Sequence, residues 1–277
     1  MTTRRSFLKT GSKALLIAGM PTTLMAAVNR FAPGLKLRIA IVSDGHYGQP
    51  KTDYKTSHQN LLNWMYREYV DKQLDAIVFN GDLVHDDASL FGELKSDYLG
   101  KMTLPLYAVP GNHDHMDTDG WKAIFGHPDN HSFEMGNAAF IMANTSNPKG
   151  EYLCPNDSYI KKQLERYRRK KSVFLILHIP SHIWTPEQTF YTECTSTLSL
   201  LHQYSNVKAV FHGHDHSNDS VLYTGTNLPH FFSSHYGGSW GTPYCGYRIL
   251  EIDGNDKITT YQMNATAGLI VNTTVIS

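Results

Sequence analysis

The sequence is poor in cysteine. Among its 277 residues only three are cysteines, Cys154, Cys194 and Cys245. They lie far apart and form no Cys-x-x-Cys pair, so a disulfide scaffold, a zinc ribbon and a Cys-x-x-Cys redox site are excluded. In an oxidising compartment three cysteines allow one disulfide with one thiol left over, and the sequence leaves the pair open.

Net charge, repeats and long polar tracts are lacking as well. Lysine plus arginine and aspartate plus glutamate each number 25, so the formal net charge is zero and we expect no specific nucleic-acid binding. No collagen repeat, heptad array or polar tract is present, which excludes the fibrous and disordered classes. What remains is a globular chain with 41% hydrophobic residues, enough for one substantial core, and 15 histidines.

The first 28 residues differ from the rest of the chain. They contain no acidic residue and four basic ones, Arg4, Arg5, Lys9 and Lys13, followed by an uncharged stretch over 14–28. That stretch is shorter than the roughly 18 residues of a membrane-spanning helix. A basic start, a modest apolar region and two alanines at 26–27 predict an export signal over residues 1–27. An amphipathic N-terminal helix is the alternative interpretation.

Residues 3–9 (TRRSFLK) resemble the twin-arginine signals with which bacteria export folded proteins. We therefore expect the twin-arginine export machinery as a partner and a periplasmic or extracellular location, with membrane anchoring if the signal is not cleaved. Removing four of the 25 basic residues with the signal leaves 21 against 25 acidic ones, a net charge of −4. The remaining residues, 28–277, are expected to form a single domain with no transmembrane span.

Short apolar runs alternate with helical patterns along these remaining residues. Strands are expected at 37–42, 75–79, 104–109, 172–177, 207–211, 221–223, 231–234, 247–252 and 258–263, with a hairpin over 131–144, and helices at 58–74, 89–99, 158–170 and 195–204. Several of the apolar runs are continuous rather than alternating, and helices separate them. Such strands are buried on both faces, which favours a layered α/β fold.

Side chains that can bind metal follow five of the expected strands, at the point where each strand ends. They are Asp44, His46, Asp82, Asn112, His178, His214 and His216. In open α/β sheets the loops at the carboxyl ends of strands converge on the ligand site. Aspartate, histidine and asparagine without cysteine indicate metal ions of borderline to hard character, and seven ligands exceed the needs of one tetrahedral zinc ion. The pattern predicts two ions that share a carboxylate, although each motif alone is an ordinary turn sequence.

Together these motifs resemble the signature of the calcineurin-like metallophosphoesterase superfamily. They are Asp44-x-His46, Gly81-Asp82, Gly111-Asn112-His113-Asp114, His178 and Gly213-His214-x-His216, and the resemblance covers about residues 37–252. The resemblance implies a four-layer α/β/β/α sandwich with a dinuclear metal site at the carboxyl ends of the strands. It implies two divalent or trivalent ions, with Mn, Fe or Zn expected. One ion would be held by Asp44, His46, Asp82 and His216, and the other by Asp82, Asn112, His178 and His214, with Asp82 bridging.

The resemblance also implies hydrolysis of a phosphate ester by a hydroxide that bridges the ions, with His113 as general acid. We expect Asp86 to orient His113. The expected substrate is a small-molecule phosphate ester, and a phosphodiester is favoured over a monoester because the motifs are shared with cyclic-nucleotide phosphodiesterases. The alternatives are a non-catalytic metal-binding protein that uses the fold for partner recognition and an amide hydrolase with one zinc ion.

Further residues near the expected site could contribute to it. The additional histidines are His115, His182, His212 and His235. Histidines beside metal loops are often only hydrogen-bonded, so direct function is the less favoured interpretation for each. The loop 234–244 mixes glycines with aromatic residues, and its Trp240 is expected either to stack on a base or sugar or to lie in a mobile surface loop.

Overall fold

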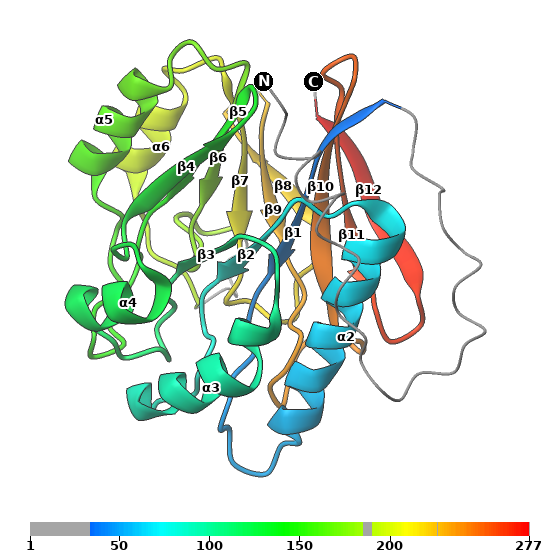
Figure 1. The fold of residues 1–277 in the computed structure, drawn as a ribbon. Coiled ribbons are helices and arrows are strands. Elements are labelled where there is room, and N and C mark those ends of the chain that lie inside the picture. Colours follow the sequence, from blue (N-terminus) through cyan, green and yellow to red (C-terminus); the bar gives the residue numbers. More distant parts are fainter. Residues whose placement is uncertain (1–33, 185–189, 226, 277) are drawn as a thin grey trace. The chain divides into compact units, whose positions relative to one another are not determined.

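Two six-stranded β-sheets pack face to face in the part of the chain that the computed structural model describes, residues 34–184, 190–225 and 227–276 (Figure 1). The first sheet has the strand order β12 (Leu269–Ile276), β11 (Ile258–Asn264), β10 (Gly246–Asp253), β1 (Leu35–Val42), β2 (Ala76–Asn80) and β3 (Leu106–Val109). The second has the order β4 (His131–Met135), β5 (Ala138–Met142), β6 (Ser172–Ile176), β7 (Val207–His212), β9 (Leu228–Phe232) and β8 (Val221–Thr224). The expected export signal over 1–27 lies outside the described residues.

Helices cover the outer faces of both sheets (Figure 1). The first sheet is covered by α2 (Tyr54–Lys72), α3 (Phe91–Asp97) and α4 (Thr118–Phe125), with 3-10 turns at Ala88–Leu90 and Leu99–Lys101 beside α3. The second sheet is covered by α5 (Asp157–Arg166) and α6 (Thr195–Leu201). The layers therefore follow the order α/β/β/α, and the expected four-layer sandwich is confirmed.

The layers arise because alternate residues of each central strand face opposite sides of a sheet. In β1, Ile39 and Ile41 belong to the core between the two sheets, whereas Ala40 and Val42 pack in the core that contains Leu61 of α2. All four β1 residues are fully buried. Continuous apolar runs in the sequence thus correspond to strands with a core on each side.

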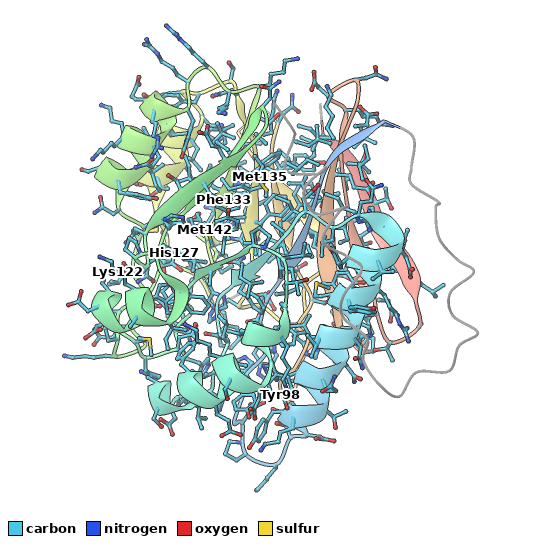
Figure 2. The ribbon with its side chains drawn as sticks, in the orientation of Figure 1. Tyr98, Lys122, His127, Phe133, Met135 and Met142 are labelled. Carbon is cyan, nitrogen blue, oxygen red and sulfur yellow. A yellow bond between two sulfur atoms is a disulfide. The ribbon has the colours of Figure 1, made fainter. Side chains whose placement is uncertain are left out.

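The edge of the inter-sheet core is closed by aromatic stacking between the two sheets. The Tyr107 ring of β3 lies 3.5 Å from the Phe133 ring of β4, and Phe133 in turn lies 4.7 Å from Phe140 of β5, measured between ring centroids. Figure 2 shows Phe133 and Met142 among the side chains near this edge. Stacked rings of this kind stabilise the fold because they bury a large apolar area and prefer a defined relative orientation.

Most expected strands and helices are present, with boundaries shifted by a few residues, but α4 and β12 were not predicted. Helix α4 is short, contains Gly120 and buries only Trp121 fully, so it has no long apolar stripe in the sequence. Strand β12 lies at the edge of the first sheet and is largely exposed, so it has no buried apolar run.

The carboxyl ends of strands from both sheets meet through Asn80, the last residue of β2. The Asn80 side-chain amide donates to the carbonyl of Phe211 in β7 at 3.3 Å, and the Asn80 carbonyl accepts from Ser43 Oγ at 2.6 Å. These bonds join the ends of β1, β2 and β7 across the two sheets. All the loops that carry the expected metal ligands begin at this end.

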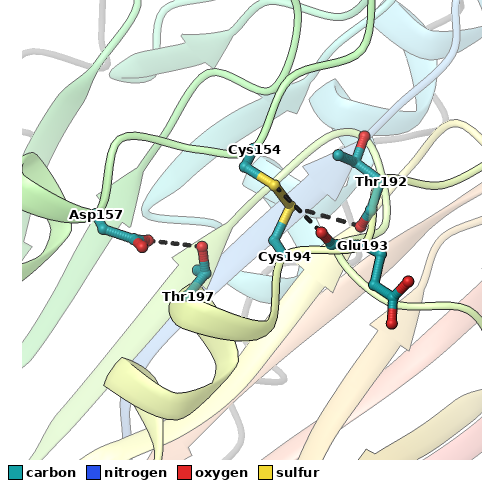
Figure 3. The surroundings of a disulfide bond; sticks show 6 residues. All are labelled: Cys154, Asp157, Thr192, Glu193, Cys194 and Thr197. Carbon is teal, nitrogen blue, oxygen red and sulfur yellow. Dashed lines mark hydrogen bonds between the residues drawn. A yellow bond between two sulfur atoms is a disulfide. The ribbon is translucent and has the colours of Figure 1, made fainter.

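A disulfide joins Cys154 to Cys194, and Cys245 keeps a free thiol. The disulfide connects the segment before α5 to the segment before α6, and the Thr197 hydroxyl donates to Asp157 beside it at 2.6 Å (Figure 3). Among the described residues, no helix has the length and apolar character needed to cross a membrane.

Candidate metal centre

The first group of metal-capable side chains consists of Asp44, His46 and His216. The Nε2 atom of His216 lies 3.1 Å from Asp44 Oδ1 and 3.0 Å from Nε2 of His46. All three side chains are almost fully buried. Three ligand atoms this close to one another, from the loops after β1 and β7, are placed to surround a single cation.

The second group consists of Asp82, His178 and His214, with Asn112 beside them. His178 Nε2 lies 3.2 Å from Asp82 Oδ2. Three buried atoms of the expected ligands make no hydrogen bond, namely Asn112 Oδ1, His178 Nε2 and His214 Nε2. Because buried polar atoms rarely stay unsatisfied, these unused lone pairs fit the coordination of a metal ion.

Asp82 belongs to the second group but also lies close to the first. Its Oδ2 atom is 3.2 Å from His178 Nε2 in the second group and 3.8 Å from His46 Nε2 in the first. Its other oxygen, Oδ1, accepts the backbone N–H of His113 at 2.9 Å. This position fits a carboxylate shared by two ions, as the sequence predicted; the ligand roles themselves stay predictions.

Backbone carbonyls orient two of the histidine rings so that Nε2 faces the site. The Nδ1 atom of His178 lies 2.7 Å from the carbonyl of Asn80, and the Nδ1 atom of His216 lies 3.0 Å from the carbonyl of Trp240. A carbonyl only accepts, so Nδ1 carries a proton in both rings and Nε2 is the nitrogen that faces the site. This outer contact is the usual way in which a metal-binding histidine is fixed.

The charges of the buried groups suit cation binding. Burial alone would raise the pKa of Asp44 and of Asp82, but His216 beside the first and His178 beside the second outweigh it, and both pKa values lie well below the ordinary range. Burial lowers the pKa of His46 and that of His214 to about 3, which keeps both imidazoles neutral. The site thus presents two carboxylates and the neutral nitrogen donors of His46 and His214. The carboxylates outweigh burial at the other two rings and raise the pKa of His178 to about 9 and that of His216, so a metal ion would replace a proton there.

Unusual backbone conformations present these side chains to the site. Asp44, His46, Asp82 and His214 all have positive φ angles, between 46° and 68°, in the left-handed region that non-glycine residues rarely adopt. Such conformations cost free energy and are concentrated at functional sites. Gly81 also has a positive φ, of 80°, and a Cβ there would overlap the His178 ring. Glycine is therefore required before Asp82.

His113 and Asp86 lie together at the mouth of the site, as expected. Asp86 Oδ1 is 2.6 Å from Nδ1 of His113 and 3.2 Å from Nε2 of His115. The side chains of His113 and Asp86 are 32% and 54% exposed, so solvent and substrate can reach them. The contact between Asp86 and His113 is present; their catalytic roles stay predictions.

Two residues beside the ligands were not assigned a role from the sequence. The buried carboxylate of Asp114 accepts four backbone N–H groups, those of Asp82, Leu83, Val84 and Gly111, at 2.7–3.0 Å. It fixes the loop after β2 to the loop after β3. His85 Nδ1 lies 3.0 Å from Nδ1 of His46, and the His85 ring stacks on His113. The only signal for Asp114 was its place in the Gly-Asn-His-Asp motif.

The other candidate histidines lie in different surroundings. His235 stacks on His216 with 5.2 Å between ring centroids, and His115 also contacts the carbonyl of Pro148. His212 is buried and lies 2.9 Å from Nδ1 of His230, in a chain of contacts that leads away from the ligands. His182 packs against Trp184. None of these four belongs to a metal-capable group among the described residues.

Comparison with known proteins identifies the family. A family model described as calcineurin-like phosphoesterase matches residues 37–218, about two thirds of the chain. The chain belongs to the calcineurin-like phosphoesterase family. It is accordingly a hydrolase of phosphate esters, and the two groups of candidate ligands described above lie within the matched residues.

Individual relatives of this phosphoesterase are distant. A probable cyclic nucleotide phosphodiesterase of Coxiella burnetii is 24% identical over 198 residues, which span 69% of this chain and 80% of the relative. The crystal structure of a dimetal phosphatase from Danio rerio has a TM-score of 0.67 at 12% identity and covers 88% of this chain and 99% of its own. A purple acid phosphatase from yellow lupin (Lupinus luteus) seeds has a TM-score of 0.63 at 12% identity, covering 87% of this chain and 53% of that one. At this identity the structures show the fold alone.

Proposed function

We propose that the protein hydrolyses a phosphodiester at a centre of two metal ions. The observation that supports this most directly is the position of Asp82, which belongs to the group Asp82–His178–His214 and also lies 3.8 Å from His46 of the other group. Two ions bound there would neutralise charge on the phosphoryl oxygens and make a water molecule nucleophilic near neutral pH. The ligand side chains themselves are nearly fully buried.

His113 is proposed to protonate the leaving oxygen. The ring lies beside the ligand groups, with 5.0 Å between its centroid and that of His46, and remains partly exposed. Asp86 accepts from Nδ1, which fixes the ring and directs Nε2 away from the carboxylate. Histidine suits this role because its two nitrogens can hold and release a proton near neutral pH.

A phosphodiester is the proposed substrate class, with a phosphomonoester as the second candidate. The name of the Coxiella burnetii relative, a probable cyclic nucleotide phosphodiesterase, supports a diester. For metal-loaded protein we expect bis-p-nitrophenyl phosphate to be hydrolysed faster than p-nitrophenyl phosphate at equal concentration. A chelator should abolish both activities, because the ligands alone provide no nucleophile. The assay follows p-nitrophenolate release with and without the chelator.

Other outcomes of this assay separate the alternatives. Preference for the monoester would contradict the substrate proposal but keep the phosphoesterase. No turnover of either ester by protein that holds two metal ions would favour a non-catalytic metal-binding protein.

We also propose that the protein is exported through the twin-arginine pathway and acts in the periplasm or outside the cell. The Cys154–Cys194 disulfide supports this location, because disulfides persist in oxidising compartments and are rare in the cytosol. Folded export would carry a centre that already contains its metal ions, as the burial of the ligands favours.

A further inference from the structure

Three half-exposed aromatic side chains lie beside the metal ligands. Tyr152, Phe190 and Trp240 are 36%, 46% and 43% exposed. The Tyr152 and Phe190 rings meet the His214 ring edge to face, with centroids 4.9 and 5.9 Å away. Trp240 stacks on His216 with 4.0 Å between centroids and 8° between planes. We call Tyr152, Phe190 and Trp240 the aromatic rim.

The rim reaches both ligand groups. His216 belongs to the first group and His214 to the second. At least one ring of the aromatic rim therefore contacts a histidine of each group. A contiguous patch of exposed apolar side chains beside a polar site is a mark of a ligand-binding groove.

The Phe190 and Trp240 rings are almost far enough apart for a third planar ring to stack between them. Their ring centroids are 6.1 Å apart and their planes differ by 33°. A planar ring inserted between two others needs about 7 Å, twice the optimal carbon–carbon contact distance. A rotation of the Phe190 side chain, which is 46% exposed, would provide this spacing.

Hydrogen bonds to His216 and the disulfide position the segments that carry the three rim residues. The Trp240 carbonyl and the Thr242 N–H both bond to His216, at 3.0 and 2.8 Å. The disulfide joins Cys154, two residues after Tyr152, to Cys194, four residues after Phe190 (Figure 3). The disulfide therefore ties together the two segments that carry Tyr152 and Phe190.

We infer that the aromatic rim is a subsite for a nucleobase, which stacks between Trp240 and Phe190 while its phosphate lies at the metal ions. The substrate class is thus a nucleoside phosphodiester. This inference rests on the proposed function for the position of the phosphate. The Cys154–Cys194 disulfide positions the rim.

Binding of two analogues that cannot be hydrolysed tests the subsite without requiring turnover. The probes are the 5′-methylenephosphonates of adenosine and of ribose, titrated calorimetrically into the metal-loaded full chain. The adenosine analogue should bind about 5- to 150-fold more tightly, which is the contribution of one base stacked on aromatic side chains. Trp240→Ala and Phe190→Ala should each reduce this ratio toward 1 and change binding of the ribose analogue less than about twofold.

Control variants separate stacking from loss of structure. Trp240→Phe should keep most of the ratio, and Tyr66→Ala, which removes a 54% exposed aromatic residue from α2, should leave it unchanged. The double variant Cys154→Ala/Cys194→Ala should lower the ratio while metal content stays the same. An unchanged ratio in that double variant would contradict the positioning role of the disulfide.

The outcomes distinguish the subsite from the proposed function. Equal affinity of wild-type protein for the two analogues, or a ratio that persists in both Trp240→Ala and Phe190→Ala, overturns the subsite even if bis-p-nitrophenyl phosphate is hydrolysed. A high ratio that both variants remove supports the subsite, and absence of any phosphodiester turnover in the same protein would then overturn the proposed function alone.

Discussion

Asp82→Ala is expected to lose both metal ions and to hydrolyse bis-p-nitrophenyl phosphate at least about 10³-fold more slowly than the wild type. The carboxylate lies between the two ligand groups, so its removal takes a ligand from each ion position at once. The same substitution also removes the acceptor for the His113 N–H. Metal content by elemental analysis and the rate of hydrolysis are the two measurements.

A matched control for this variant is Asp87→Ala. Asp87 lies in the loop that follows β2 and is exposed, where it accepts from Ser89 at the start of a 3-10 turn. It should keep two ions and near-normal turnover. Retention of two ions by Asp82→Ala would show that this carboxylate does not bridge them.

His113→Ala is expected to keep both metal ions and to lose turnover by roughly 10²–10⁴-fold on phosphodiesters with alkyl leaving groups. An alkoxide is a strong base and needs a proton as it departs, whereas p-nitrophenolate leaves without one. The loss should therefore be much smaller on bis-p-nitrophenyl phosphate. Initial rates on the two kinds of diester, together with metal analysis, measure the difference.

Two companion variants sharpen this prediction. Asp86→Asn keeps the shape of the side chain that holds His113 but weakens the bond to it, and should reproduce part of the same leaving-group dependence. His115→Ala removes another histidine that contacts Asp86 and should have little effect. Equal losses on good and poor leaving groups in His113→Ala would remove the proton-donor role.

The central layers and the candidate ligand residues could be predicted from the sequence because continuous apolar runs mark the buried strands and metal-capable residues follow five of them. Short continuous apolar runs such as 172–177 are typical of strands buried on both faces, and metal-capable residues directly after parallel strands converge at one edge. The structure places Asp44, His46 and His216 in one group and Asp82, His178 and His214 in another, in agreement with that reasoning.

Other features could not be predicted because they depend on distant segments. The half-exposed Tyr152 and Phe190 have no pattern in the sequence, since only the fold brings their loops to His214. The choice of Cys154 and Cys194 over Cys245 likewise depends on which segments become neighbours. Asp114 follows His113 in the chain, yet its role depends on backbone groups of the loop after β2, thirty residues earlier.

A metal titration of the metal-free full chain tests the dinuclear centre most directly. Protein stripped by a chelator is titrated with Mn²⁺ or Zn²⁺ while bound metal and hydrolysis of bis-p-nitrophenyl phosphate are followed together. We expect binding to saturate at two ions per chain and activity to reach its maximum only as the second ion binds. Full activity with one ion per chain, or in the stripped protein, would contradict the two-ion centre.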